Sequence, residues 1–217
     1  MSGCRIEHIL ITRSEAVDAD PSSACSCIGL FIEEAIERGY EEHELPLDAM
    51  RFAALLDYHG EVMNGGHAQY YMNKDEDLTN LQAASEMLSR IGLPQHAGLI
   101  GQYSKISSDS EDRIHEIYGE GSSDYYQKVA EIFYGIDDKF VELENSEGTL
   151  LTHLHDWVLQ QSWVVVADAE GPASVDWIRR AIPDPPSRDE RMAARFRRRH
   201  AENHGFNLAL IHKVWRR

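Results

Sequence analysis

The chain has 217 residues, 42% of them hydrophobic, so it is long and apolar enough to bury a core. Its 37 acidic residues against 21 basic ones give a formal net charge of −16, and such a field repels phosphate backbones and anionic lipids. Direct binding of nucleic acid or of a membrane by the main body is therefore not expected.

The charge is unevenly distributed along the chain. Residues 1–170 hold 32 acidic and 10 basic side chains, a net charge of −22. Residues 171–217 hold 5 acidic and 11 basic side chains, a net charge of +6. The sequence therefore predicts an acidic body with a basic C-terminal part.

Residues 1–27 are expected to form an irregular or briefly extended lead-in, because small and polar residues fill the stretch before residue 27. No signal-peptide pattern occurs there, and the longest apolar run, near residues 163–167, is too short to span a bilayer. Cys4, Cys25 and Cys27 match neither a disulfide framework nor a zinc site, so reduced thiols and a cytoplasmic location are expected.

Apolar residues at helical spacing then predict an all-α fold, with one multi-helix globular domain and a C-terminal helical extension. The predicted helices cover residues 28–38, 47–63, 79–91, 111–118, 123–143 and 147–167, and a further helix begins at Pro94. Asp77 or Thr79 is the expected N-cap of the third helix. The β-branched run within Trp163 to Val166 continues a helical stripe and has no evident strand partner, so a helix is predicted there.

Gly171 and Pro172 mark the expected boundary between an acidic helical domain of residues 28–170 and a basic extension of residues 171–217. The extension is expected to contain a short helix at 175–181, a proline-rich linker at 183–186, an arginine-rich helix at 189–204 capped by Ser187, and the segment 206–215. Its arginines favour docking on the acidic surface of the same molecule, or of a second subunit in a homodimer, over binding of nucleic acid.

No recognisable catalytic motif is present. The chain lacks a nucleophile elbow, a phosphate loop, a dinucleotide fingerprint and a zinc-protease motif. His153 and His155 would point to different faces of one helix, and His59 and His67 are separated by a glycine pair, so neither pair forms a metal site with convergent ligands. The sequence predicts no enzymatic activity, no metal and no cofactor.

One polar segment, from residue 58 to residue 73, stands out. A helix that runs into Asn64, Gly65 and Gly66 must break there, because both glycines weaken it and permit left-handed backbone angles. Polar side chains at such a break would satisfy the backbone groups that the break leaves unpaired. The alternative is a polar pocket for a ligand, lined by Glu61, Asn64, Gln69 and Asn73, and it predicts a raised pKa for Glu61.

The run E-x-x-N-G-G-x-x-Q-Y-x-x-N, which here is Glu61, Asn64, Gly65, Gly66, Gln69, Tyr70 and Asn73, resembles the signature of the bacterial DNA-mimic-protein family. An Asp-Asp-x-Phe/Tyr element of that family is matched by Asp137, Asp138, Lys139 and Phe140. The resemblance covers about residues 28–164 and implies an all-helical fold. It also implies a surface of carboxylates that imitates DNA phosphates and occupies the DNA-binding face of a transcriptional regulator.

Rows of acidic residues are the candidate interaction surface. They are Glu33, Glu34, Glu37, Glu41, Glu42 and Glu44; Asp75, Glu76 and Asp77; Asp109, Glu111 and Asp112; and Asp137, Asp138, Glu142 and Glu144. A non-enzymatic protein that binds a basic protein surface, such as that of a DNA-binding protein, is the first hypothesis. The alternatives are a ligand-binding or enzymatic domain at the helix break and an immunity or antitoxin protein that neutralises a basic toxin.

Overall fold

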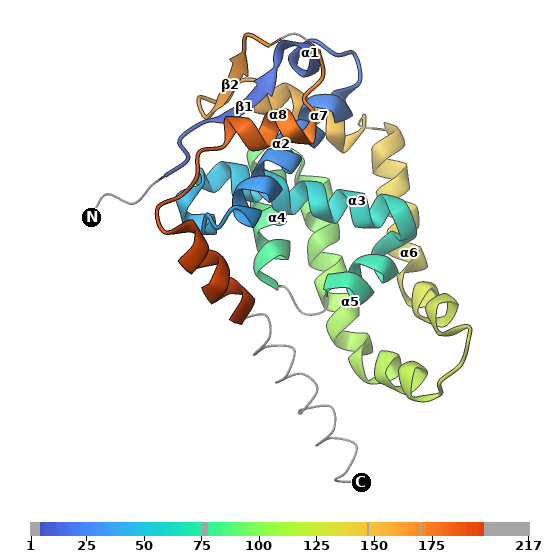
Figure 1. The fold of residues 1–217 in the computed structure, drawn as a ribbon. Helices are drawn as coiled ribbons and strands as arrows, with labels where there is room; N and C mark the ends of the chain where they lie inside the picture. Colours follow the sequence, from blue (N-terminus) through green and yellow to red (C-terminus); the bar gives the residue numbers. More distant parts are fainter. Residues whose placement is uncertain (1–4, 75–77, 147, 170, 198–217) are drawn as a thin grey trace.

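The fold is all-α apart from a two-stranded sheet, which confirms the predicted fold class (Figure 1). The computed structural model describes residues 5–74, 78–146, 148–169 and 171–197. Its elements are β1 (Ile9–Thr12), α1 (Arg13–Ala16), α2 (Pro21–Glu37), the 3-10 helix η1 (Glu42–Glu44), α3 (Leu47–Lys74), α4 (Leu78–Arg90), α5 (Pro94–Gly119), α6 (Tyr125–Ser146), α7 (Leu150–Val158), β2 (Val164–Ala167) and α8 (Val175–Ala181). Residues 188–197 form a further helix.

The segment predicted as an irregular or briefly extended lead-in contains the short strand β1, which agrees with the extended alternative. The prediction is wrong for α1 and for the start of α2, which begins at Pro21, seven residues before the predicted start. The Asp20 side chain accepts a hydrogen bond from the Ser22 N–H, and Pro21 occupies the first helical position, so both start signals lie within the polar stretch. Cys25 and Cys27 are reduced, and burial raises the pKa of each thiol to about 12.

The helix predicted through Val166 is also wrong. Helix α7 ends at Val158, and Val164–Ala167 forms strand β2. It pairs in parallel with β1, Ile9 opposite Val164 and Thr12 opposite Ala167. Its partner, β1, lies in the segment predicted to be irregular or briefly extended, and with that partner the β propensity of three consecutive valines outweighs the helical pattern.

Helix boundaries differ from the prediction in two further places. Helix α5 runs without a break from Pro94 to Gly119, so the separate helix predicted at 111–118 is only its last part. Pro94 is the first residue of α5, as predicted, and Gly92 adopts φ 80 in the turn before it. Helix α4 begins at Leu78, so Thr79 does not cap it, and Asp77 lies outside the described residues.

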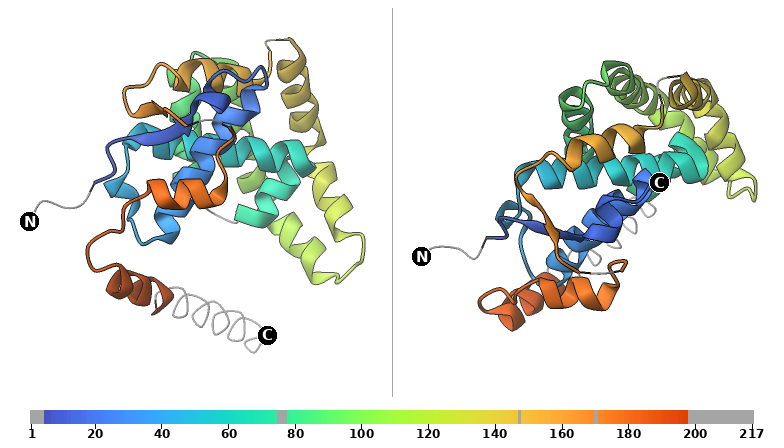
Figure 2. Two further views of the ribbon diagram at one scale, coloured as in Figure 1. Left: turned by 45° about the horizontal axis from the view of Figure 1, so that its top comes forward. Right: turned by 90° about the horizontal axis from the view of Figure 1, so that it is seen from above.

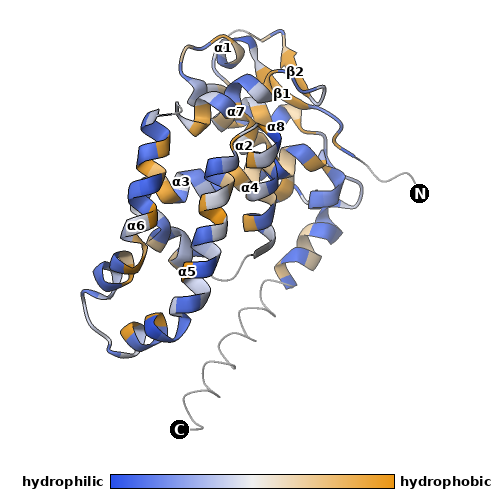
Figure 3. Ribbon diagram, turned by 180° about the vertical axis from the view of Figure 1, so that it is seen from behind, coloured by the Kyte–Doolittle hydropathy of each residue, from blue (hydrophilic) through white to orange (hydrophobic). Residues whose placement is uncertain are grey.

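The helices form two connected groups around one core (Figure 2). Helix α3 packs against α4 and α6, and α5 packs against α4 and α6. Helix α2 packs against β1, α3, α7 and α8. A Cβ atom on Gly29 would lie 2.9 Å from Leu56 Cδ2, so this glycine permits the close approach of α2 to α3. Colouring by hydropathy shows alternating polar and apolar stretches on these helices, as one-sided burial requires (Figure 3).

The basic extension packs on the acidic body over its described part. Helix α8, which has the predicted bounds, packs on α2, and both Ile178 within it and Ile182 directly after it are buried. The Arg179 Nε donates to Glu34 Oε2 over 2.8 Å. The next helix begins at residue 188, after Ser187, whose φ is 56. The intramolecular alternative is therefore the one that the described residues adopt.

Candidate functional site

The predicted break in α3 is confirmed at the two glycines. Gly65 has φ −155 and ψ 24, and Gly66 has φ 73 and ψ −177, so both leave the helical range. The conformation of Gly66 lies in a region of backbone space that is almost confined to glycine. The chain then resumes a helix from residue 67 to Lys74.

Asp137 of α6 caps the helix that restarts. Its Oδ1 accepts the backbone N–H of His67 over 2.9 Å and the ring Nδ1 of His67 over 2.6 Å. A Cβ atom on Gly66 would lie 2.7 Å from Asp137 Oδ2, so only glycine leaves room for this carboxylate. A negative charge at a helix N-terminus is stabilised by the unpaired N–H groups and the helix dipole. Asp137 therefore serves the fold, whereas its neighbour Asp138 is exposed.

The imidazole of His67 links Asp137 to Tyr58 inside the core. Its Nε2 lies 2.8 Å from the Tyr58 hydroxyl, and with Nδ1 as the donor to the Asp137 carboxylate, Nε2 accepts the hydrogen bond that the hydroxyl donates. Burial raises the pKa of Tyr58 well above 10. His67 is 0% exposed and Tyr58 is 1% exposed, so no substrate reaches this Asp–His–Tyr relay and it acts structurally.

The polar residues of the signature form a second, outward-facing network. Glu61 Oε2 accepts Gln69 Nε2 over 2.7 Å and Asn73 Nδ2 over 2.8 Å. The Tyr126 hydroxyl of α6 donates to the Gly65 carbonyl over 2.7 Å.

Beside this network lies an open surface depression of about 430 Å³. It is lined by Asp57, Gly60, Glu61, Asn64, Gln69 and Asn73. The hydrogen bond from Gln69 lowers the pKa of Glu61, so the raised pKa predicted for a catalytic pocket is wrong. Because Gln69 and Asn73 donate to the ionised Glu61 carboxylate, this network favours a structural role that links the helical segments before and after the break.

The sequence did not reveal a third cluster, in which two buried histidines flank Glu144. His59 Nε2 lies 3.5 Å and His96 Nε2 lies 3.4 Å from the Glu144 carboxylate, whose side chain is 9% exposed. The carboxylate also accepts the Leu150 N–H at the start of α7, over 3.0 Å. Burial raises the pKa of Glu144, but His59, His96 and the Leu150 N–H outweigh it and lower the pKa to about 2. Glu144 of α6 therefore links its own helix to α3 through His59, to α5 through His96 and to α7 through Leu150.

The structure divides the predicted acidic surface. Exposed members are Glu33, Glu37, Glu42, Asp109, Glu111, Asp112, Asp138 and Glu142, and Glu41 is half-buried. Glu34 and Glu44 are buried and paired with Arg179 and Arg191 of the extension, and the Arg191 guanidinium lowers the pKa of Glu44. Asp137 and Glu144 face inward, and Asp75, Glu76 and Asp77 lie outside the described residues. Sequence spacing alone did not separate the paired carboxylates from the exposed ones.

Many of the exposed acidic side chains lie on α5, on α6 and between them, and these two helices form an antiparallel hairpin that projects from the body (Figure 1). Residues 105–146 contain 11 acidic and 4 basic side chains. Tyrosines surround the tip, where Tyr118 and Tyr125 are 45% and 40% exposed and their rings lie 5.5 Å apart. Tyr134, on the exposed side of α6, is 46% exposed. We name these two helices and their connection the acidic hairpin.

Membrane-spanning helices and metal centres are two other kinds of site to consider among the described residues. No helix of this part of the chain is sufficiently long and apolar to cross a bilayer. In the same ranges, no three or more His, Cys, Asp or Glu side chains are grouped so that they could hold a metal ion.

Comparison with known proteins gives one match. The model of the DMP19-like protein family matches residues 43–161, a range that includes the break in α3, Asp137, Glu144 and the acidic hairpin. No curated protein and no solved structure matches the chain. Because the matched range is more than half of the 217 residues, the chain belongs to the DMP19-like protein family.

Proposed function

We propose that this protein is a non-enzymatic DNA mimic that binds the basic, DNA-binding surface of another protein through its acidic hairpin. The DMP19-like family is a DNA-mimic protein family, which supports the general role. The observation that carries the proposal for this chain is the row of exposed carboxylates on α6. Glu131, Asp138 and Glu142 are exposed and recur after seven and four residues, so they lie on one face of the helix.

The spacing of this row supports mimicry of a phosphate track. At a rise of about 1.5 Å per residue, the three carboxylates are separated along the axis by about 10 Å and about 6 Å. One DNA strand carries a charge about every 3.4 Å, so these separations correspond to about three and two phosphate steps. Flexible side chains can absorb the remaining mismatch.

The exposed tyrosines support a protein partner. Tyrosine is enriched where proteins meet, because it gives a large, rigid contact area together with a hydroxyl group. Tyr134 lies between Glu131 and Asp138 on α6, and Tyr118 and Tyr125 lie at the tip of the hairpin. Aromatic groups within the carboxylate row and at the tip of the hairpin would add contact area that charge alone does not provide.

The described part of the basic extension, residues 171–197, does not cover this surface. Among the described residues, the ion pairs between the extension and the rest of the chain involve Glu34 and Glu44 with Arg179 and Arg191, and Arg38 with Asp184. These residues lie on or just after α2, on η1, on α8 and beyond α8, and Figure 2 shows the coloured part of the extension apart from the acidic hairpin in both views. The carboxylates of the hairpin are therefore accessible to a partner.

The test compares two variants that lose the same charge. Glu131→Gln/Asp138→Asn/Glu142→Gln removes the row on α6, and Asp156→Asn/Asp168→Asn/Asp176→Asn removes three exposed carboxylates elsewhere. Both variants and the wild type are immobilised and then incubated with extract of the native cells. The incubation is done at low and at high salt, with and without excess double-stranded DNA. The proposal expects basic proteins that bind the wild type and the control variant, are displaced by DNA or salt, and are lost from the hairpin variant.

Equal loss of binding by the two variants would show that net charge alone is responsible, and capture that resists both salt and DNA would contradict mimicry. Circular dichroism of the three proteins at the same concentration provides the control for folding.

A further inference from the structure

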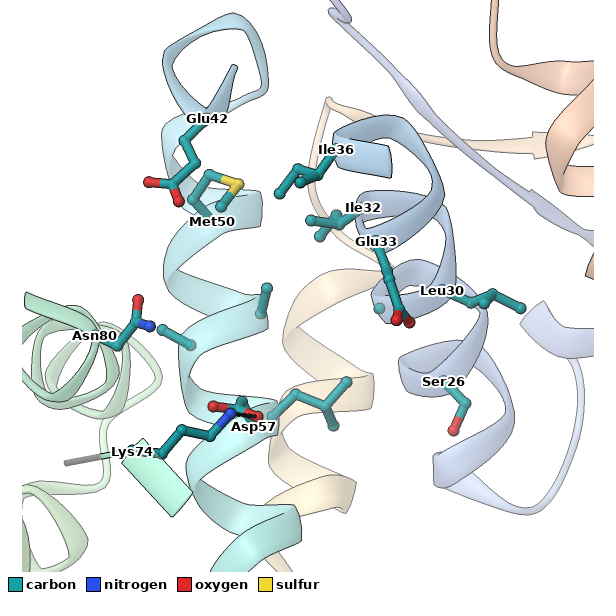
Figure 4. Close-up of a pocket in the computed structure, with 14 residues that line it drawn as sticks. Ser26, Leu30, Ile32, Glu33, Ile36, Glu42, Met50, Asp57, Lys74 and Asn80 are labelled. Carbon is teal, nitrogen blue, oxygen red and sulfur yellow. Dashed lines mark ion pairs between the residues drawn. The ribbon is translucent and has the colours of Figure 1, made fainter. Parts of the chain in front are cut away.

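A second surface is an open groove between α2 and α3 (Figure 4). Its volume is about 580 Å³. The floor is apolar, and its side chains include Leu30, Ile32 and Ile36 of α2 and Met50, Ala53 and Leu56 of α3. Among the apolar side chains of α2, Ile32 is buried, and Leu30 and Ile36 are partly exposed.

Carboxylates border this apolar floor. Glu33 and Glu42 line the groove, are exposed, and have no ion-pair partner within the described ranges of the chain. Asp57 and Lys74 also line it, and their ion pair, with Nζ and Oδ1 2.9 Å apart, leaves that part of the rim neutral. The groove therefore suits an apolar segment that carries positive charge.

The described part of the extension leads to this groove. The Arg191 Nη1 donates to Glu44 Oε2 over 2.6 Å, and Arg191 Cβ and Met192 Sδ lie beside Gly39, just after α2. The Arg195 guanidinium donates to the carbonyl of Ile36, which itself lines the groove. The last described turn of the chain thus lies at the Ile36 end of the groove.

The residues that follow have the matching composition. Residues 198–217 contain five Lys or Arg and one Glu, and Leu208, Ile211 and Trp215 recur at intervals of three and four residues. About ten residues separate Arg197 from Leu208, and they can span about 30 Å when extended. The stretch of α2 from Ser26 to Ile36 is only about 15 Å long at 1.5 Å per residue.

We propose that residues 206–217 bind in the α2–α3 groove of the same molecule. Leu208, Ile211 and Trp215 cover the apolar floor, and the Lys and Arg residues of this segment face Glu33 and Glu42. The proposal does not rest on the DNA-mimic function, because the groove and the acidic hairpin are separate surfaces. Binding here would neutralise acidic groups of α2 and leave those of α6 exposed.

Photo-crosslinking of the full chain tests this placement. Benzoylphenylalanine replaces Trp215, and after irradiation the crosslinked peptides are identified by mass spectrometry. An equal mixture of ¹⁵N-labelled and unlabelled chains separates crosslinks within one molecule from those between two. The expected product joins position 215 to peptides of residues 26–36 or 50–57 of the same chain.

Charge-reversal variants provide the second arm. Glu33→Lys/Glu42→Lys should lower the yield of the groove crosslink roughly threefold or more, because each side chain then repels the basic segment. Asp156→Lys/Asp176→Lys, which makes the same change of net charge at exposed sites, should leave the yield unchanged. Crosslinks between two chains, crosslinks to other surfaces, or a groove crosslink that both variants lower equally would overturn the proposal.

Discussion

The backbone of Gly66 gives the sharpest test of how the family segment is built. Gly66→Ala forces a Cβ atom onto a residue at φ 73 and ψ −177, a region that costs a non-glycine residue about 1–3 kcal/mol. The new atom would also lie 2.7 Å from Asp137 Oδ2, so the carboxylate must move away from the His67 N–H. Loss of a helix cap costs about 0.5–2 kcal/mol. Together these effects predict a loss of about 2–4 kcal/mol in the free energy of unfolding.

Urea denaturation followed by circular dichroism at 222 nm measures this loss directly. The matched control is Gly60→Ala, six residues earlier in the same helix, where a Cβ atom would meet no other atom within 4 Å. Alanine at such a helical position should stabilise the protein by about 0.5–1 kcal/mol. The two substitutions add the same methyl group to one helix and are expected to change stability in opposite directions.

A result in which Gly66→Ala costs less than about 1 kcal/mol with an unchanged m-value would refute this reasoning. It would mean that α3 continues as a regular helix through residue 66 at no penalty, and that Asp137 is not a cap.

Three further predictions concern carboxylates that face the interior, at Asp137, Glu144 and Glu44. Asp137→Asn should lower the free energy of unfolding by about 1–2 kcal/mol, because the amide lacks the charge that stabilises the restarting helix, whereas Asp138→Asn at the exposed neighbour should change it little. The pKa of Glu144 is about 2 in the folded protein against an ordinary 4.5, so its stabilisation is complete above pH 4.5 and is lost as the pH falls towards 2. The free energy of unfolding should fall as the pH is lowered over this range, and Glu144→Gln should make that fall smaller by about 1–3 kcal/mol. An unchanged titration in the variant would contradict the assignment. Arg191→Ala should cost about 1–3 kcal/mol, since it leaves the Glu44 carboxylate buried without its guanidinium partner, and a double-mutant cycle with Glu44→Gln should show coupling between them.

Helical periodicity predicted most of the fold because most helices have one buried face and one exposed face. The break at Gly65 and Gly66, the start of α5 at Pro94 and the bounds of α8 followed from the local preferences of glycine, proline and serine. The β1–β2 pairing could not be predicted in this way. Neither strand has a local signal for its partner, and pairing across the length of the chain is a property of the packed core.

The candidate site was predictable only where its contacts are local in the sequence. The signature residues were found from their order in the sequence, and their hydrogen bonds to one another lie within one kinked helix. The role of Asp137 was missed because it comes from α6, 70 residues after His67. Glu34 and Glu44 were assigned to the acidic surface because their arginine partners lie in the extension. Ionic contacts between distant segments leave no trace in local spacing.

The parallel pairing of β1 with β2 also has a consequence for the order of folding. Ile9 pairs with Val164, so the first strand to leave the ribosome waits for a partner 155 residues later. At about 5–20 residues per second, synthesis of that interval takes roughly 8–30 s, far longer than local helix formation. Helices α3 to α6 have contacts close in sequence and can assemble during that wait. We therefore expect β1 and the strand it pairs with to join last, and the N-terminal residues to be the segment most exposed to aggregation and to chaperones during synthesis.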